Sequence, residues 1–209
     1  MASRVILNAG NIMWCRVNPG SMEPPTHDQP GKFIRKFPGL NNNVKSHKNI
    51  LFLRYHAVVC AGIGSGLAPH QSFIRDRVHA SKSGVEVAPF SLYFGNRFKA
   101  REFLYRTELE QIAEKHKDWF KLHTAFSRDT AGKKVYVQDL VAITDDAYKY
   151  LLERQGMLYV CGNRNLPKPL QKSLKASFAQ GKVDKESAEE AAKAVEDLFV
   201  HGRGQQEVW

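Results

Sequence analysis

Four short apolar runs, separated by stretches of helical periodicity, constrain the fold of this chain more than any other feature of its sequence. Runs of this length are typical of buried strands. They are Ala57–Ala61, Phe90–Phe94, Leu122–Phe126 and Met157–Cys161. Because strands that alternate with helices pair in parallel, the pattern predicts an α/β fold in which a parallel sheet is flanked by helices on both faces.

The helical stretches lie between and after these runs. The first opens at Ala68-Pro69, where a proline suits the first helical turn, and its apolar residues continue at helical spacing. We predict further helices over 103–113 and 148–152, and another that begins near Leu166. A last helix is expected from about Asp184 to His201, because an apolar stripe runs along it.

The first fifty residues have a different composition. They hold five of the nine prolines and the run Asn41-Asn42-Asn43, and they show no sustained periodicity. Such a segment is expected to be mostly loop, with one or two strands. We therefore divide the chain into an irregular segment, residues 1–54, and a ligand-binding domain, residues 55–209.

The net charge of +10 narrows the choice of partner. Nucleic-acid recognition favours Lys and Arg clustered on one element with interleaved aromatic residues. Here the basic residues are scattered along the sequence. We expect no nucleic-acid partner, and the charge favours a small anionic ligand or an acidic protein partner.

Cysteine usage and hydropathy indicate the cellular setting. Cys15, Cys60 and Cys161 are widely spaced, with no CxxC pair, so neither a disulfide framework nor a metal site is expected. No apolar run approaches the length of a membrane span, and the first residues lack a clean secretory signal. A reduced, cytoplasmic location is the expectation.

A glycine-rich loop follows the first predicted strand and opens the first predicted helix. Its glycines, Gly62, Gly64 and Gly66, are two residues apart. A dinucleotide fingerprint needs its third glycine three places after the second, where Leu67 stands, and a Walker loop needs a Lys after the last glycine. The loop is therefore either another kind of phosphate cradle at a helix N-terminus or an ordinary tight turn.

Residues 127–138 offer a second group of anion-binding side chains. Ser127 and Arg128 follow a predicted strand, and Lys134, Tyr136 and Gln138 alternate onto one face if the segment is extended. A hydroxyl, a guanidinium, an ammonium and a phenol suit a phosphate monoester beside a stackable base. Taken alone, the stretch also fits a solvated basic loop.

Several motifs in one order resemble the NADP(H)-binding module of the ferredoxin–NADP reductase superfamily, in its diflavin branch. They are the glycine loop 62–70, LYFGNRFKAREFLYRTELE at 92–110, AFSR through KVYVQ at 125–138, YVCGN at 159–163, and the final Glu207-Val208-Trp209. His70 stands where the family has Phe. Upstream, 33–36 resembles the strand that closes the family's FAD domain, and 10–14 resembles a flavin-contacting segment of that domain.

The resemblance implies a Rossmann-like NADP(H)-binding domain preceded by a remnant of the flavin-domain β-barrel. Gly64, Ser65, Gly66 and Arg97 would hold the coenzyme pyrophosphate. The adenosine 2′-phosphate and adenine would lie against Ser127, Arg128, Lys134, Tyr136 and Gln138. The catalytic group would comprise Cys161 beside the nicotinamide, Glu207 stabilising positive charge on the ring, and Trp209 stacking on a flavin.

Two functions follow from that resemblance. The first is the NADPH-binding part of a diflavin oxidoreductase, which passes hydride to FAD on a missing upstream domain and relies on FAD and FMN domains of a parent protein. The second is a stand-alone NADP(H)-binding or sensing protein without redox chemistry. Cys161, Glu207 and Trp209 favour the first, because a simple binder has no evident use for them.

Overall fold

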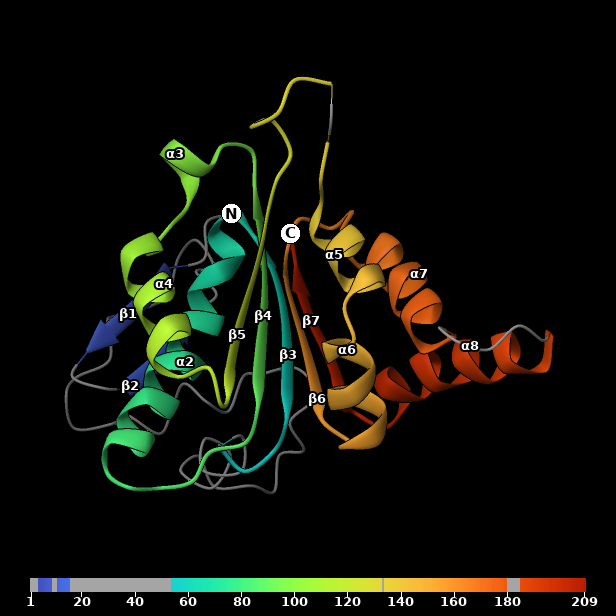
Figure 1. Ribbon diagram of the computed structural model, residues 1–209, viewed down its shortest axis with the longest axis horizontal. Helices are drawn as coiled ribbons and strands as arrows, with labels where there is room; N and C mark the ends of the chain where they lie inside the picture. The colour runs from blue at the N-terminus through green and yellow to red at the C-terminus, as the bar shows by residue number, and fades with distance from the viewer. Residues whose placement is uncertain (1–3, 9–10, 16–53, 133, 180–184) are drawn as a thin grey trace.

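The computed structural model describes residues 4–8, 11–15, 54–132, 134–179 and 185–209. Its centre is a five-stranded parallel sheet in the order β5-β4-β3-β6-β7 (Figure 1). The strands are β3 (Val58–Ile63), β4 (Phe90–Asn96), β5 (Phe120–Phe126), β6 (Met157–Gly162) and β7 (Gly204–Val208). Because all five run in one direction, their carboxyl ends meet at one edge of the sheet.

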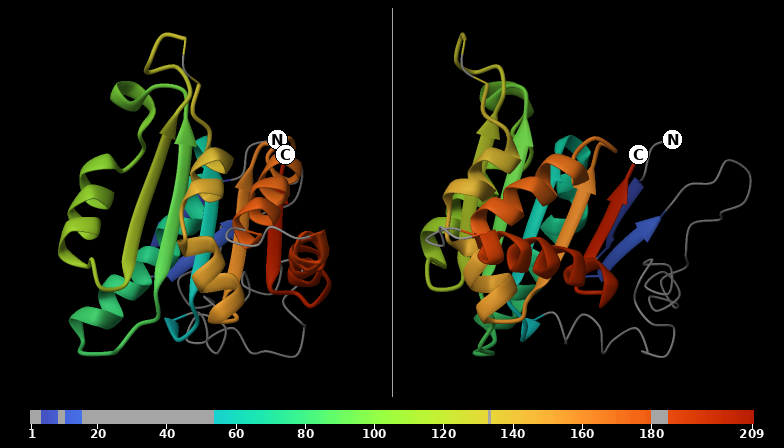
Figure 2. Two further views of the ribbon diagram at one scale, coloured as in Figure 1. Left: turned by 45° about the vertical axis from the view of Figure 1, so that its right-hand side comes forward. Right: turned by 90° about the vertical axis from the view of Figure 1, so that its right-hand side faces the viewer.

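Helices cover both faces of the sheet, as the sequence predicted (Figures 1 and 2). On one face lie α2 (Leu67–Lys82), α3 (Lys99–Glu102) and α4 (Arg106–Lys115). On the other lie α5 (Val137–Ile143), α6 (Asp146–Tyr148), α7 (Pro167–Phe178) and α8 (Lys185–Val200), with the π-helical turn η3 (Lys149–Glu153) after α6.

The core consists of two apolar clusters, one on each face of the sheet. Leu92 and Phe94 of β4 point toward α2 and α4, whereas Tyr93 between them points toward α5 and α6. This alternation is the period of two that a strand imposes on its side chains. Because helices cover both faces of the sheet, the central strands β3, β4 and β6 are buried on both faces.

The four predicted strands are confirmed, but β7 was not predicted. Its sequence, GQQEV, contains a single strand-forming residue, Val208. Only its pairing with β6 places it in the sheet: Glu207 lies opposite Cys161, and Val208 opposite Gly162.

The predicted helices differ from the observed ones at their boundaries. The stretch 103–113 does not form one helix, because Tyr105 takes a left-handed conformation (φ 53°) just before α4 begins. Prolines at the start of α7 do not obstruct it, since Pro167 occupies the first turn, where its missing N–H is not needed.

The N-terminal segment is described only as two strands. β1 (Arg4–Asn8) and β2 (Asn11–Cys15) pair antiparallel and lie beside α2 (Figure 1). The motif at 33–36 and Gly10 lie outside the described residues. The boundary between 1–54 and 55–209 therefore stays a prediction.

His70 gives the domain a titratable group beneath the glycine loop. Its side chain is 1% exposed in the second turn of α2, and its Nε2 lies 3.3 Å from the carbonyl oxygen of Ala61. Burial lowers the His70 pKa from its usual 6.5 to about 4, against the opposing effect of that hydrogen bond. The imidazole is consequently neutral in the folded protein at neutral pH.

The buried His70 predicts acid sensitivity of the fold. Since its folded pKa lies below the unfolded value, the unfolded chain takes up the proton first, and stability is lost as pH falls from 6.5 toward 4. The loss by pH 5 should be about 2 kcal/mol. In urea unfolding at pH 7 and pH 5, His70→Phe should not show the loss of folding stability that protonation of His70 causes. His79→Gln, an exposed position on the same helix, should retain it; equal pH dependence in His70→Phe would contradict the assignment.

Candidate functional site

A cleft of about 490 Å³ opens at the edge where the strand carboxyl ends meet. In parallel α/β sheets this edge is where ligands bind. All five strand ends and the starts of α5 and α7 contribute to it. The contributing residues include Ser65 after β3, Arg97 after β4, Ser127 after β5, Asn163 after β6 and Trp209 after β7.

The glycine loop forms a single 3₁₀ turn, Gly64–Gly66, that leads directly into α2. Gly64 has φ +56° and open space around it, and it lines the cleft with Ser65. Gly66 is buried instead. A Cβ there would lie 2.1 Å from the carbonyl oxygen of Cys161, so glycine is required for α2 to approach the end of β6.

The start of α2 is suited to an anion. The helix is 16 residues long and has no acidic residue in its first turn, and the exposed Ser65 lies in the 3₁₀ turn that precedes it. Unpaired backbone N–H groups and the helix dipole favour a phosphate at such a position. Of the two interpretations of the glycine loop, the phosphate cradle is the one that its position at the cleft favours.

Arg97 reaches the cleft as one half of an ion pair. Its guanidinium donates to both carboxylate oxygens of Glu102, at 3.2 and 2.6 Å. The hydrogen bond from Arg97 lowers the pKa of Glu102. Glu102 also accepts from the backbone N–H groups of Arg97 and Phe98, so it fixes the turn after β4.

The segment after β5 is held in place by the neighbouring turn. The N–H of Ser127 donates to the carbonyl of Asn96 at 3.0 Å, and that of Arg128 to the carbonyl of Arg97 at 2.8 Å. Ser127 lines the cleft, whereas the exposed side chain of Arg128 does not. The parallel pairing of β4 and β5 thus continues past both strands and brings their ends together.

The expectation of one extended face for Lys134, Tyr136 and Gln138 is wrong. α5 begins at Val137, so Gln138 lies in a helical turn and Tyr136 is the residue that caps it. The carboxylate of Asp139 accepts from the N–H of Tyr136 at 2.8 Å, which stabilises this early start. Tyr136 and Gln138 nevertheless line the cleft, while Lys134 is exposed outside it.

Cys161 and Glu207 lie side by side on β6 and β7 beneath the cleft. Cys161 is 2% exposed and does not line the cleft. Burial, with a smaller contribution from the charge of Glu207, raises the pKa of the Cys161 thiol to about 12. The thiol is therefore neutral and acts here as a compact, polarisable group rather than as a base or nucleophile.

Trp209 is held at the cleft by its backbone. Its N–H donates to the carbonyl of Gly162 at 3.1 Å, and its carbonyl accepts from the N–H of Arg164 at 3.0 Å. The indole lines the cleft and is 45% exposed. An aromatic ring in this position has a free face on which a planar ligand could stack.

Sequence reasoning missed one wall of the cleft. Asn165, Leu166 and Pro169, at the turn from β6 into α7, line it together with Asn163. The position of this turn directly after a strand end was the available signal.

Among the described residues, no group of three or more His, Cys, Asp or Glu side chains could hold a metal ion. The described helices also include none with the length and apolarity needed to cross a membrane.

Comparison with known proteins agrees with this architecture. Residues 58–172 match the family described as the oxidoreductase NAD-binding domain. The mitochondrial pyruvate dehydrogenase [NADP(+)] of Euglena gracilis is 36% identical over 204 residues, which cover 97% of this chain and 10% of that protein. The NADPH–cytochrome P450 reductase of Candida maltosa is 34% identical over 153 residues, 73% of this chain and 22% of that protein.

The chain thus spans only about a tenth to a fifth of the length of these relatives. The matched family and the order of the motifs around the cleft support the same family assignment. The chain belongs to the oxidoreductase NAD-binding domain family, within the diflavin reductase branch of the ferredoxin–NADP reductase superfamily.

Proposed function

We propose that this chain is the NADP(H)-binding module of a larger flavoprotein oxidoreductase, and that it carries the nicotinamide to a flavin held elsewhere in the parent protein. The observation that carries the proposal is the cleft itself. It combines an acid-free helix start on one side, a hydroxyl and phenol at the β5–α5 connection, and an exposed indole at the end of β7.

The positions of the anion-binding groups around the cleft favour one orientation of the coenzyme. The pyrophosphate lies at Gly64, Ser65 and the start of α2, and Arg97 adds a partly neutralised positive charge. Ser127 and Tyr136 receive the adenosine end, where the exposed cations of Arg128 and Lys134 pair with the 2′-phosphate. Gly66 contributes indirectly, by letting α2 stand close to β6.

The nicotinamide end then lies near β6 and β7. The neutral Cys161 thiol, buried at the end of β6, adds no charge near the ring, and Glu207 on the next strand would favour the positively charged, oxidised ring. The exposed Trp209 would offer its ring to a flavin or to the nicotinamide at this end of the cleft. When FAD is present in the parent protein, it supplies the N5 atom that exchanges hydride with the nicotinamide C4.

Transfer from NADPH to FAD is the direction that the names of the cytochrome P450 reductases suggest. A second candidate is the reverse direction, reduction of NADP⁺ by a reduced flavin, since NADP(+) appears in the name of the pyruvate dehydrogenases that the chain resembles. The extent of the alignments supports this second candidate. Relatives of that name from Euglena gracilis and Cryptosporidium parvum match 97% of this chain, including its N-terminal segment. The reading frame upstream of Met1 in the parent transcript distinguishes the two.

Direct binding tests the proposal. The isolated chain should bind NADPH and bind NADH far more weakly in calorimetric titrations, while its absorption spectrum shows no flavin band, because the flavin contacts lie on another domain. Equal affinity for the two coenzymes would contradict the site. A stand-alone sensor would bind NADPH equally well, but the parent protein would then fail to oxidise NADPH in stopped-flow mixing or to reduce NADP⁺.

A further inference from the structure

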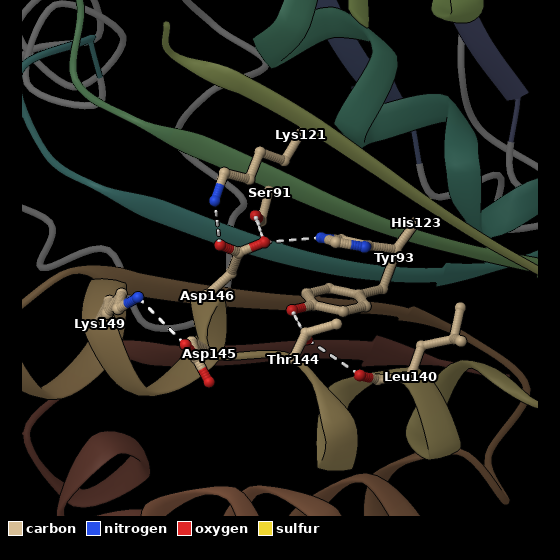
Figure 3. A network of polar contacts seen from close by, with 9 residues as sticks. All are labelled: Ser91, Tyr93, Lys121, His123, Leu140, Thr144, Asp145, Asp146 and Lys149. Carbon is tan, nitrogen blue, oxygen red and sulfur yellow. Dashed lines mark hydrogen bonds and ion pairs between the residues drawn. The ribbon is translucent and has the colours of Figure 1, made fainter. Parts of the chain in front are cut away.

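A buried carboxylate behind the cleft organises a polar network that the proposed chemistry does not use. Asp146, the first residue of α6, is 4% exposed. Its Oδ2 accepts hydrogen bonds from Ser91 Oγ at 3.0 Å and His123 Nε2 at 2.6 Å, and its Oδ1 from Lys121 Nζ at 2.6 Å (Figure 3). These donors come from β4 and β5. One side chain thus ties the helical layer to two neighbouring strands.

The charge of Asp146 is maintained by its donors. Burial by itself would raise the pKa, but hydrogen bonds from His123 and Lys121 and the charges of these groups lower the Asp146 pKa from 3.8 to about 2. The same hydrogen bond to Asp146 raises the pKa of Lys121. Asp146 is therefore an anion at neutral pH, and its hydrogen bonds to β4 and β5 are retained there.

A second contact holds the residue that follows α5. The hydroxyls of Tyr93 and Thr144 lie 2.6 Å apart, and Thr144 Oγ1 donates to the carbonyl of Leu140 at 2.9 Å (Figure 3). The Tyr93 ring stacks on His123, with centroids 4.5 Å apart and planes 17° from parallel. The stack connects Tyr93 to His123, a hydrogen-bond partner of Asp146, and the two bonds of Thr144 hold the last turn of α5 against β4.

The other end of α5 faces the cleft. Val137 and Gln138, its first two residues, line the cleft beside Tyr136. A helix of seven residues is about 10 Å long and is not stable in isolation. Its position therefore depends on tertiary contacts, and the network supplies them at the end opposite the cleft.

The same network also holds the strand that leads into the phosphate-binding segment. Lys121 and His123 precede the end of β5 at Phe126, where the segment from Ser127 to Tyr136 begins. That segment leaves β5 and returns into α5, and Asp146 ties β5 to α6, which follows α5 after Thr144 and Asp145. One end of the segment is consequently held through Asp146, and the other through α5, whose last turn is held by Thr144 next to α6.

We propose that Asp146 is a positioning residue for the adenosine 2′-phosphate, an inference that rests on the proposed function. It acts directly on β5 and, along the chain through Asp145 and Thr144, on the end of α5, and it does not touch the coenzyme. Charge-assisted hydrogen bonds need donor–acceptor distances near 2.7–2.9 Å, so a small shift at either end of the segment from Ser127 to Tyr136 affects the phosphate contacts most. The backbone cradle at α2 is built on other elements and is not affected.

NADP⁺ and NAD⁺ provide the test, because they differ only in the 2′-phosphate. In calorimetric titrations, Asp146→Asn should weaken NADP⁺ binding roughly tenfold and change NAD⁺ binding less than about twofold. Asp145→Asn is the matched control. Asp145 is the preceding residue, and it forms an exposed i,i+4 pair with Lys149 at 3.1 Å (Figure 3). Its removal should change neither affinity.

Milder variants keep the test decisive if Asp146→Asn fails to fold. Tyr93→Phe and Thr144→Val remove the second contact without unpairing a charge, and each should weaken NADP⁺ about threefold more than NAD⁺. Variants that lose affinity for both coenzymes equally, or for neither, would overturn the inference while leaving the proposed function in place. If the chain without substitutions does not prefer NADP⁺ to NAD⁺, both the proposed function and this inference are wrong.

Discussion

Arg128→Ala is expected to weaken NADPH binding on the order of a hundredfold and to leave NADH binding almost unchanged. A dianionic 2′-phosphate can accept two charge-assisted hydrogen bonds from one guanidinium, each contributing about 1.5 kcal/mol or more. Loss of both, about 3 kcal/mol, corresponds to roughly a hundredfold in affinity. NADH carries a hydroxyl at this position and has no such bonds to lose. Calorimetry with both coenzymes measures the effect.

Arg154→Ala provides the matched control for that measurement. Arg154 is also exposed, but it precedes β6 and so lies at the amino edge of the sheet, opposite the cleft. Its removal changes the net charge equally. If both variants weaken NADPH to the same extent, Arg128 acts only through long-range charge, and the direct contact is ruled out.

Gly66→Ala should destabilise the domain by about 3 kcal/mol or more, because the added methyl group meets backbone rather than a side chain that can rotate away. Its Cβ would lie 2.1 Å from the carbonyl oxygen and 2.6 Å from the carbonyl carbon of Cys161. Relief requires α2 to move away from β6, which also opens the proposed pyrophosphate cradle. Urea unfolding should show the loss of stability, and any folded fraction should bind NADPH weakly.

Gly84→Ala separates this clash from backbone strain. Gly84 has φ +76° with nothing within 4 Å of a Cβ, and it follows the other end of α2. Its replacement should cost only the left-handed conformation, about 1–2 kcal/mol. A Gly66→Ala variant no less stable than Gly84→Ala would show that α2 and β6 are not closely packed at this point.

The sequence by itself determined the layered architecture. Three of the four predicted strands, β3, β4 and β6, are buried on both faces, because a parallel sheet between two helical layers excludes water from both sides. The edge strand β5 carries Lys121 and His123 on one face. The place of the cleft followed as well, since ligand-binding motifs that come directly after parallel strands must meet at one edge. Local patterns were sufficient here because burial alone selects them.

Tertiary structure decided the features that depend on partners distant in the sequence. The weak strand former GQQEV became β7 only because β6 offered an unpaired edge. Gly66 is needed for packing against Cys161, almost a hundred residues later. Asp146 reads as an ordinary surface acid until the fold brings Ser91, Lys121 and His123 around it. No periodicity encodes such contacts, because their energies arise only when separate elements exclude water between them.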